Sequence, residues 1–389
     1  MKTDSSRRRF LATGLSLPVA GMASMATSPP STLAGPAPAP QGGGLSYRTL
    51  GKTGLKVTSV GFGCMITSDA SVIEKAADLG INYFDSARSY QGGNNERMVG
   101  AALKGKRKNL VLSTKTGAGN KQGALEHLDT SLKELGTDYI DIWYLHGKGS
   151  IAQVTDELID AQQTAKKAGK IRFAGVSTHA GQAELVPALV KGGQMDVILC
   201  AYNFSLDPNV TEALNAARKA GVGVVAMKVM AGGFRRAKEG EKLFETLKKP
   251  GAMLAALKWV LSNPNVDTTI PSMTDMDQLD ENLKAMSQGL TESDKKVLAA
   301  QLEYIRPLYC RMCGDCSGTC PQGLPVSDIL RYLTYADGYG QFALGREHFK
   351  QLPPDIAAVR CDLCPSCLVS CPNGVKVSQR LTRAQEVFA

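Results

Sequence analysis

Aromatic residues are few in this 389-residue sequence, basic residues form no long run after the first ten positions, and no Gly-x-Gly-x-x-Gly motif follows a predicted strand. Aromatics make up 6% of the chain and are not interleaved with basic residues, so the net charge of +9 indicates solvated surface and argues against nucleic-acid binding. The segment Gly61-Phe62-Gly63 lacks the third glycine and the helix start of a Rossmann site, and no flavin site is visible. A nucleic-acid-binding protein and a Rossmann-fold enzyme are therefore not supported.

The N-terminus carries three arginines followed by a weakly apolar run. The arginines at positions 7–9 precede Phe10-Leu11, and the run that follows is broken by glycine and proline and is too short for a comfortable membrane span. The pattern resembles a twin-arginine export signal over residues 1–27, and a basic disordered tail is the alternative. Residues 28–44 are rich in proline, glycine and alanine and are expected to form a linker.

Such a signal implies that the twin-arginine export machinery is a partner and that the protein is periplasmic or otherwise exported. Cleavage near Ala26 or Ala34 would release the mature protein, whereas an uncleaved signal would leave it anchored in the membrane. The sequence leaves this choice open, because neither cleavage site is clean.

From Val57 onward, short apolar runs alternate with longer helical patterns. Glycines such as Gly80 and Gly136 follow the helical runs, as glycines that end helices do. Eight strand–helix units in succession predict an α/β fold, a (β/α)8 TIM barrel that occupies residues 45–300. The predicted strands end near residues 63, 84, 114, 145, 177, 201, 228 and 270.

Four residues with chemically active side chains follow successive predicted strands. Asp85 directly follows the apolar run 81–84, and Tyr90 lies five residues further on in the loop. Lys115 ends the next strand, and His146 follows the one after it. Since active sites of barrel enzymes lie at the rim where parallel strands end, we expect these four side chains to share a site. Each alone would read as a capping, solvated or loop residue, but four at consecutive strand ends favour a site.

These four groups suit proton donation to a carbonyl oxygen. A tyrosine hydroxyl has an ordinary pKa near ~10, too high for easy proton donation at neutral pH, and a nearby lysine cation lowers it by favouring the phenolate. A carboxylate can fix that lysine, and a neutral histidine can orient the carbonyl. We therefore expect Lys115 to lower the pKa of Tyr90.

The segments around these residues resemble the aldo-keto reductase family. The resemblance covers residues 45–288 and includes NYFDSARSY, NNERMVGAALK, STKTG, RFAGVSTH and IPSMTDMDQLDENL. It implies that Tyr90 is the general acid, that Lys115 and Asp85 tune it, and that His146 positions the substrate. It also implies hydride transfer between nicotinamide and a small-molecule carbonyl or alcohol, and a hairpin before the first strand that closes the barrel bottom.

The family's nicotinamide contacts are less well matched than its catalytic residues. Where typical members carry a lysine and a later arginine around the 2′-phosphate, this chain has Ser272 and Gln278. Losing both cations removes two charge-assisted phosphate contacts, so the resemblance leaves the choice between NADP and NAD open. The positions that it assigns to cofactor binding are Ser177, Thr178, Tyr202, Ser272, Gln278, Glu281 and Asn282.

Eight of the ten cysteines lie after residue 309, in two runs with the same C-x2-C-x2-C-x3-C-P spacing. That spacing is a strong signal for [4Fe–4S] binding, in which the fourth cysteine of each run ligates the other cluster. Zinc, which prefers two separated pairs, and disulfides are minor alternatives. One cluster is assigned Cys310, Cys313, Cys316 and Cys371, and the other is assigned Cys361, Cys364, Cys367 and Cys320.

The residues between the two cysteine runs are predicted to be helical, at 326–335 and 345–351. The second module, residues 301–389, therefore resembles the mainly α-helical type of ferredoxin. Cys64 and Cys200 are expected to be buried core thiols. His179 is read equally as a pocket residue or a loop imidazole, and His127 and His348 have no predicted partner.

The sequence supports two functions of different classes. The first is an exported iron–sulfur oxidoreductase of aldo-keto reductase type, with two [4Fe–4S] clusters and NADP or NAD. The second is an electron-transfer subunit whose clusters serve a redox partner protein and whose barrel is a scaffold. Hydride transfer moves two electrons together whereas clusters pass one at a time, so either a nicotinamide cofactor is held tightly through turnover or the clusters are structural.

Overall fold

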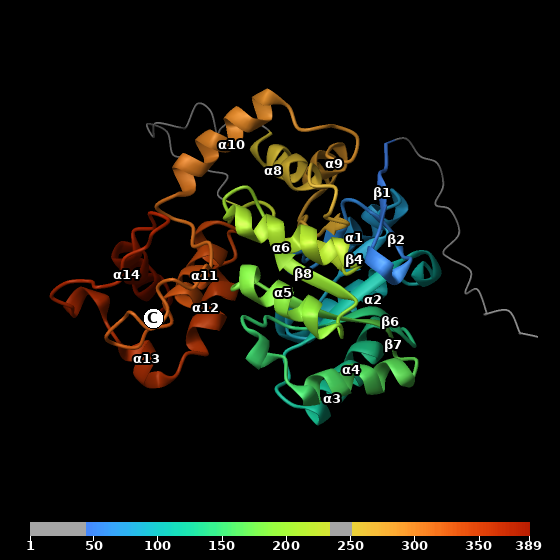
Figure 1. The fold of residues 1–389 in the computed structure, drawn as a ribbon, viewed down its shortest axis with the longest axis horizontal. Coiled ribbons are helices and arrows are strands. Elements are labelled where there is room, and N and C mark those ends of the chain that lie inside the picture. Colours follow the sequence, from blue (N-terminus) through green and yellow to red (C-terminus); the bar gives the residue numbers. More distant parts are fainter. Residues whose placement is uncertain (1–43, 234–250) are drawn as a thin grey trace, which may run out of the picture. The chain divides into compact units, whose positions relative to one another are not determined.

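The computed structural model describes residues 44–233 and 251–389 (Figure 1). The predicted export signal at 1–27 and nearly all of the predicted linker at 28–44 lie outside these residues. Within the described ranges, every helix is too short or too polar to cross a membrane.

Eight parallel strands form one sheet in which each strand is hydrogen-bonded to the next along the chain. A bridge between Val60 and Thr269 links the two ends of the sheet, and the backbone N–H of Gly61 donates to the Thr269 carbonyl oxygen at 2.7 Å. The predicted (β/α)8 barrel is therefore confirmed. Its strands are β3 (Phe62–Gly63), β4 (Tyr83–Asp85), β5 (Val111–Thr116), β6 (Ile140–Leu145), β7 (Ile171–Thr178), β8 (Val197–Ala201), β9 (Gly223–Met227) and β10 (Thr268–Thr269).

Helices follow the strands and pack on the outside of the barrel (Figure 1). In α3 the side chain of Asn120 accepts a hydrogen bond from the Gly123 N–H at 2.9 Å, and Gly136 ends the helix in the left-handed conformation with φ of 63°. The apolar face of α3, including Leu128, is buried in the layer between helices and sheet. The barrel helices are α1 (Ala70–Asp78), α2 (Asn94–Ala102), α3 (Lys121–Leu135), α4 (Asp156–Lys167), α5 (Gln182–Gly192), α6 (Pro208–Lys219), α8 (Ala252–Leu261) and α9 (Met276–Lys284).

A hairpin of β1 (Tyr47–Thr49) and β2 (Lys56–Thr58) precedes the barrel, as the resemblance implied. Leu50 and Leu55 between its strands are buried with the residues that fill the barrel interior. A Cβ at Gly51 would lie 2.3 Å from the backbone nitrogen of Gly223, the first residue of β9, so only glycine fits this approach. The hairpin therefore closes the amino end of the barrel and leaves the carboxyl ends of the strands for a site.

The C-terminal region is mainly helical, as predicted, and has its own apolar core. Leu333 of α11, Phe349 of α12 and Phe388 of α14 are buried in that core, and several cysteines of both runs pack against it. The predicted module boundary at residue 300 falls inside α10. The helices of this region are α10 (Glu292–Ile305), α11 (Val326–Asp337), α12 (Phe342–Lys350), α13 (Pro354–Ala358) and α14 (Val377–Phe388).

Candidate active site

Three of the four predicted catalytic residues share one hydrogen-bond network at the carboxyl ends of β4 and β5. The ammonium of Lys115 is ion-paired with the carboxylate of Asp85 and donates to the hydroxyl of Tyr90 at 3.1 Å. It also donates to the Ser86 carbonyl oxygen at 2.7 Å, while the Ser113 hydroxyl donates to Asp85 at 2.7 Å. Asp85 and Lys115 are almost fully buried, so water is excluded from the pair and each charge is balanced by the other.

The pKa of the tyrosine in this network is set by two opposing effects. Burial raises the pKa of Tyr90 to about 12, and the charge of Lys115 acts in the opposite direction. Lys115 therefore acts on the pKa of Tyr90 in the expected direction, but loss of water around the phenolate outweighs the cation. Burial opposes the charge of Lys115, yet the adjacent Asp85 carboxylate keeps the pKa of the lysine above its ordinary value.

His146 directly follows β6, and its ring packs edge-on against the ring of Tyr90 with centroids 5.8 Å apart. Burial, with further contributions from the cations Lys115 and Arg331, lowers the pKa of His146 to about 3. The imidazole is therefore neutral at physiological pH, which is the state required to orient a carbonyl oxygen beside the tyrosine.

The turn that carries Tyr90 has an unusual backbone. Tyr90 begins η2 (Tyr90–Gly93), in which Gln91 adopts a left-handed φ of 52° and its side-chain amide donates to a backbone carbonyl at 2.7 Å. At Gly93, φ is 90° and a Cβ would collide with the guanidinium of Arg88, which is ion-paired to a buried glutamate. The turn is therefore held by contacts on both sides, and these contacts fix the position of the tyrosine.

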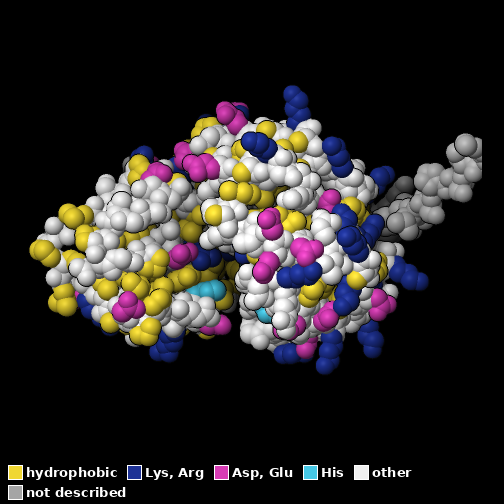
Figure 2. Space-filling view, turned by 60° about the horizontal axis from the view of Figure 1, so that its bottom comes forward, with side chains coloured by type: hydrophobic (Ala, Val, Ile, Leu, Met, Phe, Trp, Pro, Cys, Tyr) yellow, Lys and Arg dark blue, Asp and Glu magenta, His cyan; other side chains and the backbone are white. Residues whose placement is uncertain are grey.

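Tyr90 and His146 line a cavity of about 1470 Å³ at the carboxyl ends of the strands. Residues that follow β9 and β10, Lys228 and Ser272, contribute further wall, and so does Arg331 from α11. Figure 2 shows a hollow with histidine side chains at its edge, while lysines and arginines are spread over the surrounding surface. The cavity exceeds the roughly 300–1,000 Å³ of ordinary small-molecule pockets and can hold a substrate together with a second molecule.

Two of the positions assigned to nicotinamide by resemblance, Ser272 and Gln278, line this cavity. The Gln278 side chain is already hydrogen-bonded to Asp275 and to the Thr274 hydroxyl, the latter at 2.8 Å, at the start of α9. Neither position brings a cation to the cavity.

The structure does not bring the other five assigned positions to the cavity wall. The Ser177 hydroxyl accepts a bond from the Gly147 N–H at 2.9 Å, and the Thr178 hydroxyl donates within its own loop. Tyr202 is buried against Trp259, with ring centroids 5.1 Å apart. The two remaining positions are on α9, where Glu281 is partly buried and Asn282 is buried with its Oδ1 unpartnered within the described residues.

Cysteines of the two runs lie near one another in the C-terminal region. One small cavity is lined by all four members of the first set, and the Met312 N–H donates to the Cys310 sulfur at 3.4 Å. Within the second set, Cys361 interacts electrostatically with Cys364, Cys320 and Cys367. Among the described residues, no cluster of His, Cys, Asp or Glu has the geometry to hold a single metal ion, and no disulfide is formed. The two clusters therefore stay a prediction.

The profile of the aldo/keto reductase family matches residues 67–302, well over half of the chain. The chain belongs to this family. Similar proteins include the uncharacterized oxidoreductase YqkF of Bacillus subtilis, 30% identical over 64% of this chain and 94% of that protein, and L-galactose dehydrogenase of Arabidopsis thaliana, 29% identical over 68% and 96%. The holo form of the aldo-keto reductase AKR11C1 from Bacillus halodurans has a TM-score of 0.58 at 30% identity, covering 66% of this chain and 96% of that one.

This aldo/keto reductase carries site residues that the sequence reasoning missed. Lys228, Arg331 and Tyr335 all line the cavity, and His348 stacks on Tyr332 with ring centroids 5.2 Å apart. Lys228 stands at the end of a predicted strand, as Lys115 does, so position at a strand end would have identified it too. Nothing in the sequence indicated that α11, which lies beyond the family match, would supply part of the wall.

The remaining histidines and cysteines are now placed. His179 is partly buried and lines the cavity, which favours the pocket alternative. His127 pairs with the Thr116 hydroxyl at 3.0 Å. Cys64 and Cys200 are buried core thiols, as expected, and burial raises the pKa of both well above the ordinary value.

Proposed function

We propose that this aldo-keto reductase is an exported iron–sulfur enzyme that interconverts a carbonyl and an alcohol by hydride transfer with nicotinamide. The observation that carries the proposal is the buried Asp85–Lys115–Tyr90 network, which opens with His146 onto one cavity. Membership of the family supports the reaction type.

Each residue of the network has a distinct role in carbonyl reduction. The Tyr90 hydroxyl donates its proton to the carbonyl oxygen as negative charge develops there. Lys115, 3.1 Å from that hydroxyl, stabilises the phenolate that forms, and Asp85 keeps the lysine charged and in place. The neutral imidazole of His146 donates a hydrogen bond that orients the carbonyl toward Tyr90.

The cavity fits a nicotinamide cofactor as well as a substrate. It continues from Tyr90 to Ser272 and Gln278, and glycines at strand ends, Gly63 and Gly117, leave part of its wall without side chains. When bound, the reduced nicotinamide supplies the hydride to the carbonyl carbon and is itself oxidised. The test is the oxidation of NADH or NADPH by purified protein with added aldehydes, together with identification of the alcohol in equal amount; absence of both would reject the proposal.

The eight C-terminal cysteines are proposed to hold two [4Fe–4S] clusters, one in each crossed set. Support comes from the shared cavity that the first set lines and from the mutual electrostatic contacts of the second. Thiolates are the ligands that such clusters use in proteins. Iron and acid-labile sulfide analysis of the purified protein, with low-temperature electron paramagnetic resonance after dithionite reduction, tests this assignment.

The second candidate is an electron-transfer subunit that serves a redox partner protein. The observation that favours it is a small cavity whose wall contains both Cys310 of the first set and Lys228 of the barrel, with Tyr309 and Tyr335 beside them. A cluster at Cys310 would then lie close to the barrel site. Protein that contains no nucleotide, reduces no carbonyl and still exchanges electrons through its clusters would favour this alternative.

Export by the twin-arginine route is proposed from the arginines at positions 7–9 and the residues after them. The route carries folded proteins, which agrees with a chain that acquires its clusters before export. Replacement of Arg8 and Arg9 by lysine should retain the protein in the cytoplasm, and cell fractionation with an antibody against the chain measures this. Unchanged export of the variant would argue for a different route. Comparing the exported protein in membrane and soluble fractions distinguishes an uncleaved anchor from a released chain.

A further inference from the structure

The cavity wall carries the cations Lys228 and Arg331, and Lys228 has no carboxylate partner among the described residues. Lys228 directly follows β9 with a left-handed φ of 56°, and its ammonium lies 5.0 Å from the ring centroids of both Tyr335 and Tyr339. In the part of the chain that the structure describes, no ion-pair partner faces it. Burial, together with Arg331 and Lys115, lowers the pKa of Lys228 to about 7, as expected of an ammonium that lacks a counterion.

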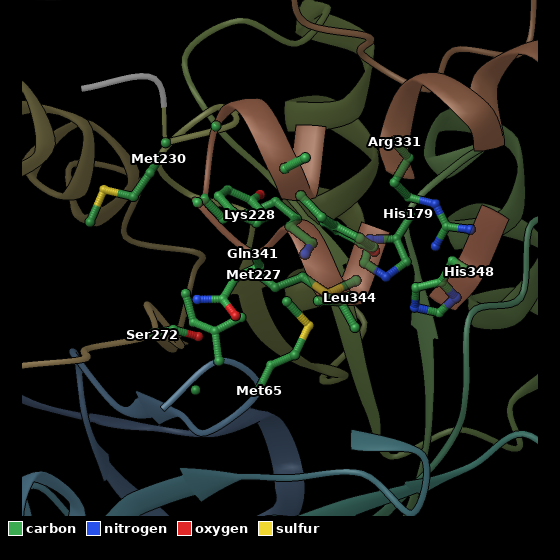
Figure 3. A pocket seen from close by; sticks show the side chains of 18 of the residues that line it. Met65, His179, Met227, Lys228, Met230, Ser272, Arg331, Gln341, Leu344 and His348 are labelled. Atoms are coloured by element: carbon green, nitrogen blue, oxygen red, sulfur yellow. The ribbon is translucent and has the colours of Figure 1, made fainter. Parts of the chain in front are cut away.

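Arg331 of α11 reaches the same cavity from the C-terminal region. One of its terminal nitrogens is ion-paired with Asp328 at 2.9 Å, while its Nε is buried and has no partner within the described residues. Figure 3 shows Arg331 with His179 and His348 on one side of the cavity. Burial, followed by charges that include Arg331, lowers the pKa of both imidazoles, so the histidines are neutral and each can offer one N–H donor.

The carboxylates that line the cavity are for the most part already engaged. Asp85 is paired with Lys115, and Asp337 is paired with Arg380 at 2.6 Å and with a second arginine of α14. Glu347 is exposed to solvent. The unpaired ammonium of Lys228 and the unpartnered Nε–H of Arg331 are therefore donors in the cavity that an anion would satisfy.

We propose that the substrate carries a carboxylate or phosphate group, which Arg331 and Lys228 bind while its carbonyl faces Tyr90 and His146. The proposal rests on the function proposed above. All four residues line the same cavity, and the ring of His146 packs against that of Tyr90. Arg331 lies beyond the family match at 67–302, so this chain's own C-terminal helix would select among the carbonyl compounds that the barrel can reduce.

The test uses the full-length holoprotein and a matched pair of aldehydes, para-carboxybenzaldehyde and its methyl ester. Arg331→Gln should lower the ratio of kcat/KM for the acid over the ester by roughly 10- to 100-fold, the loss expected for a hydrogen bond to a charged group. Lys228→Gln should act in the same direction from the barrel side. Arg346→Gln, which removes an exposed charge from neighbouring α12, should leave the ratio unchanged.

Two further measurements test whether the cations bind the substrate's anionic group or the cofactor's phosphates. Fluorescence titration with the nicotinamide cofactor should give the same Kd for the wild type and for Arg331→Gln; a weakened Kd with an unchanged aldehyde ratio would mean that the cations bind the cofactor's phosphates and would overturn the proposal. Calorimetry with terephthalate, an unreactive anion, should show binding to the wild type that Arg331→Gln weakens. If the wild type reduces neither aldehyde, the proposed function fails, and the terephthalate result still decides whether the anion site exists.

Discussion

The ammonium of Lys115 donates to the Tyr90 hydroxyl at 3.1 Å while it is paired on its other side with the buried carboxylate of Asp85. The Tyr90 hydroxyl therefore lies between the Asp85–Lys115 ion pair and the cavity. The phenolate can then form beside a cation, even though burial raises the pKa of the hydroxyl above its ordinary value.

Breaking the buried pair should destabilise the barrel. Lys115→Met leaves the Asp85 carboxylate buried without a counterion, and we expect a loss of about 3–5 kcal/mol in the free energy of unfolding. The double variant Asp85→Leu/Lys115→Met removes both charges and should recover much of that loss. Denaturant unfolding followed by circular dichroism measures the stability of both variants. Equal stability of the single and double variants would contradict the assignment of Asp85 and Lys115 as a buried, charged pair.

The rate of carbonyl reduction should not change with pH through ionisation of the two groups nearest the carbonyl. His146, with a pKa of about 3, is neutral above that pH, and Tyr90, with a pKa of about 12, keeps its proton below that one. Between about pH 5 and pH 9, kcat should therefore be nearly flat. A fall in kcat on the acid side with an apparent pKa near ~6.5 would mean that His146 titrates as an ordinary histidine.

The crossed cysteine sets predict which cluster each variant damages. Cys371→Ala should lower the iron content from about eight to about four atoms per chain and remove the signal of the cluster held by Cys310, Cys313 and Cys316. Cys200→Ala, which changes a buried core thiol of the barrel, is the control and should retain all the iron. Loss of the other cluster instead would show that each run encloses its own metal.

The absence of cations at the two phosphate positions predicts the cofactor preference. NADH should compete with NADPH better here than in relatives that carry the lysine and arginine, because Ser272 and Gln278 offer no charge. Ser272→Lys should improve kcat/KM for NADPH by about tenfold, the effect of one charge-assisted contact. A strong preference of the wild type for NADPH would show that other residues bind the 2′-phosphate.

The barrel and its catalytic network were predictable because their signals are local. Each of Asp85, Lys115 and His146 stands at the end of an apolar run, and parallel strands bring such ends together whatever the loops do. The two cysteine sets were likewise assigned from local spacing, and the clusters stay a prediction. The prediction of the fold therefore depended little on knowledge of long-range contacts.

The cavity wall was not predictable for the opposite reason. Arg331 and Lys228 line the same cavity although about a hundred residues of chain separate them, because Tyr335 of α11 packs against Lys228, and no local pattern encodes that contact. The net direction of the Tyr90 pKa shift was likewise not predictable, because burial, which raises the pKa, depends on the same long-range packing. Thr178 and Tyr202, which the resemblance assigned to cofactor binding, do not line the cavity. Their hydroxyls are hydrogen-bonded to other residues of the barrel.

The central claim is that Tyr90 is the proton donor of a nicotinamide-dependent carbonyl reduction. The most direct measurement is the single-turnover rate of aldehyde reduction by Tyr90→Phe, with Tyr47→Phe at the exposed edge of the hairpin as the control. We predict that Tyr90→Phe retains the fold and cofactor binding but slows reduction by roughly 10²–10⁴, while Tyr47→Phe is unchanged. Reduction by Tyr90→Phe at the wild-type rate would contradict the account.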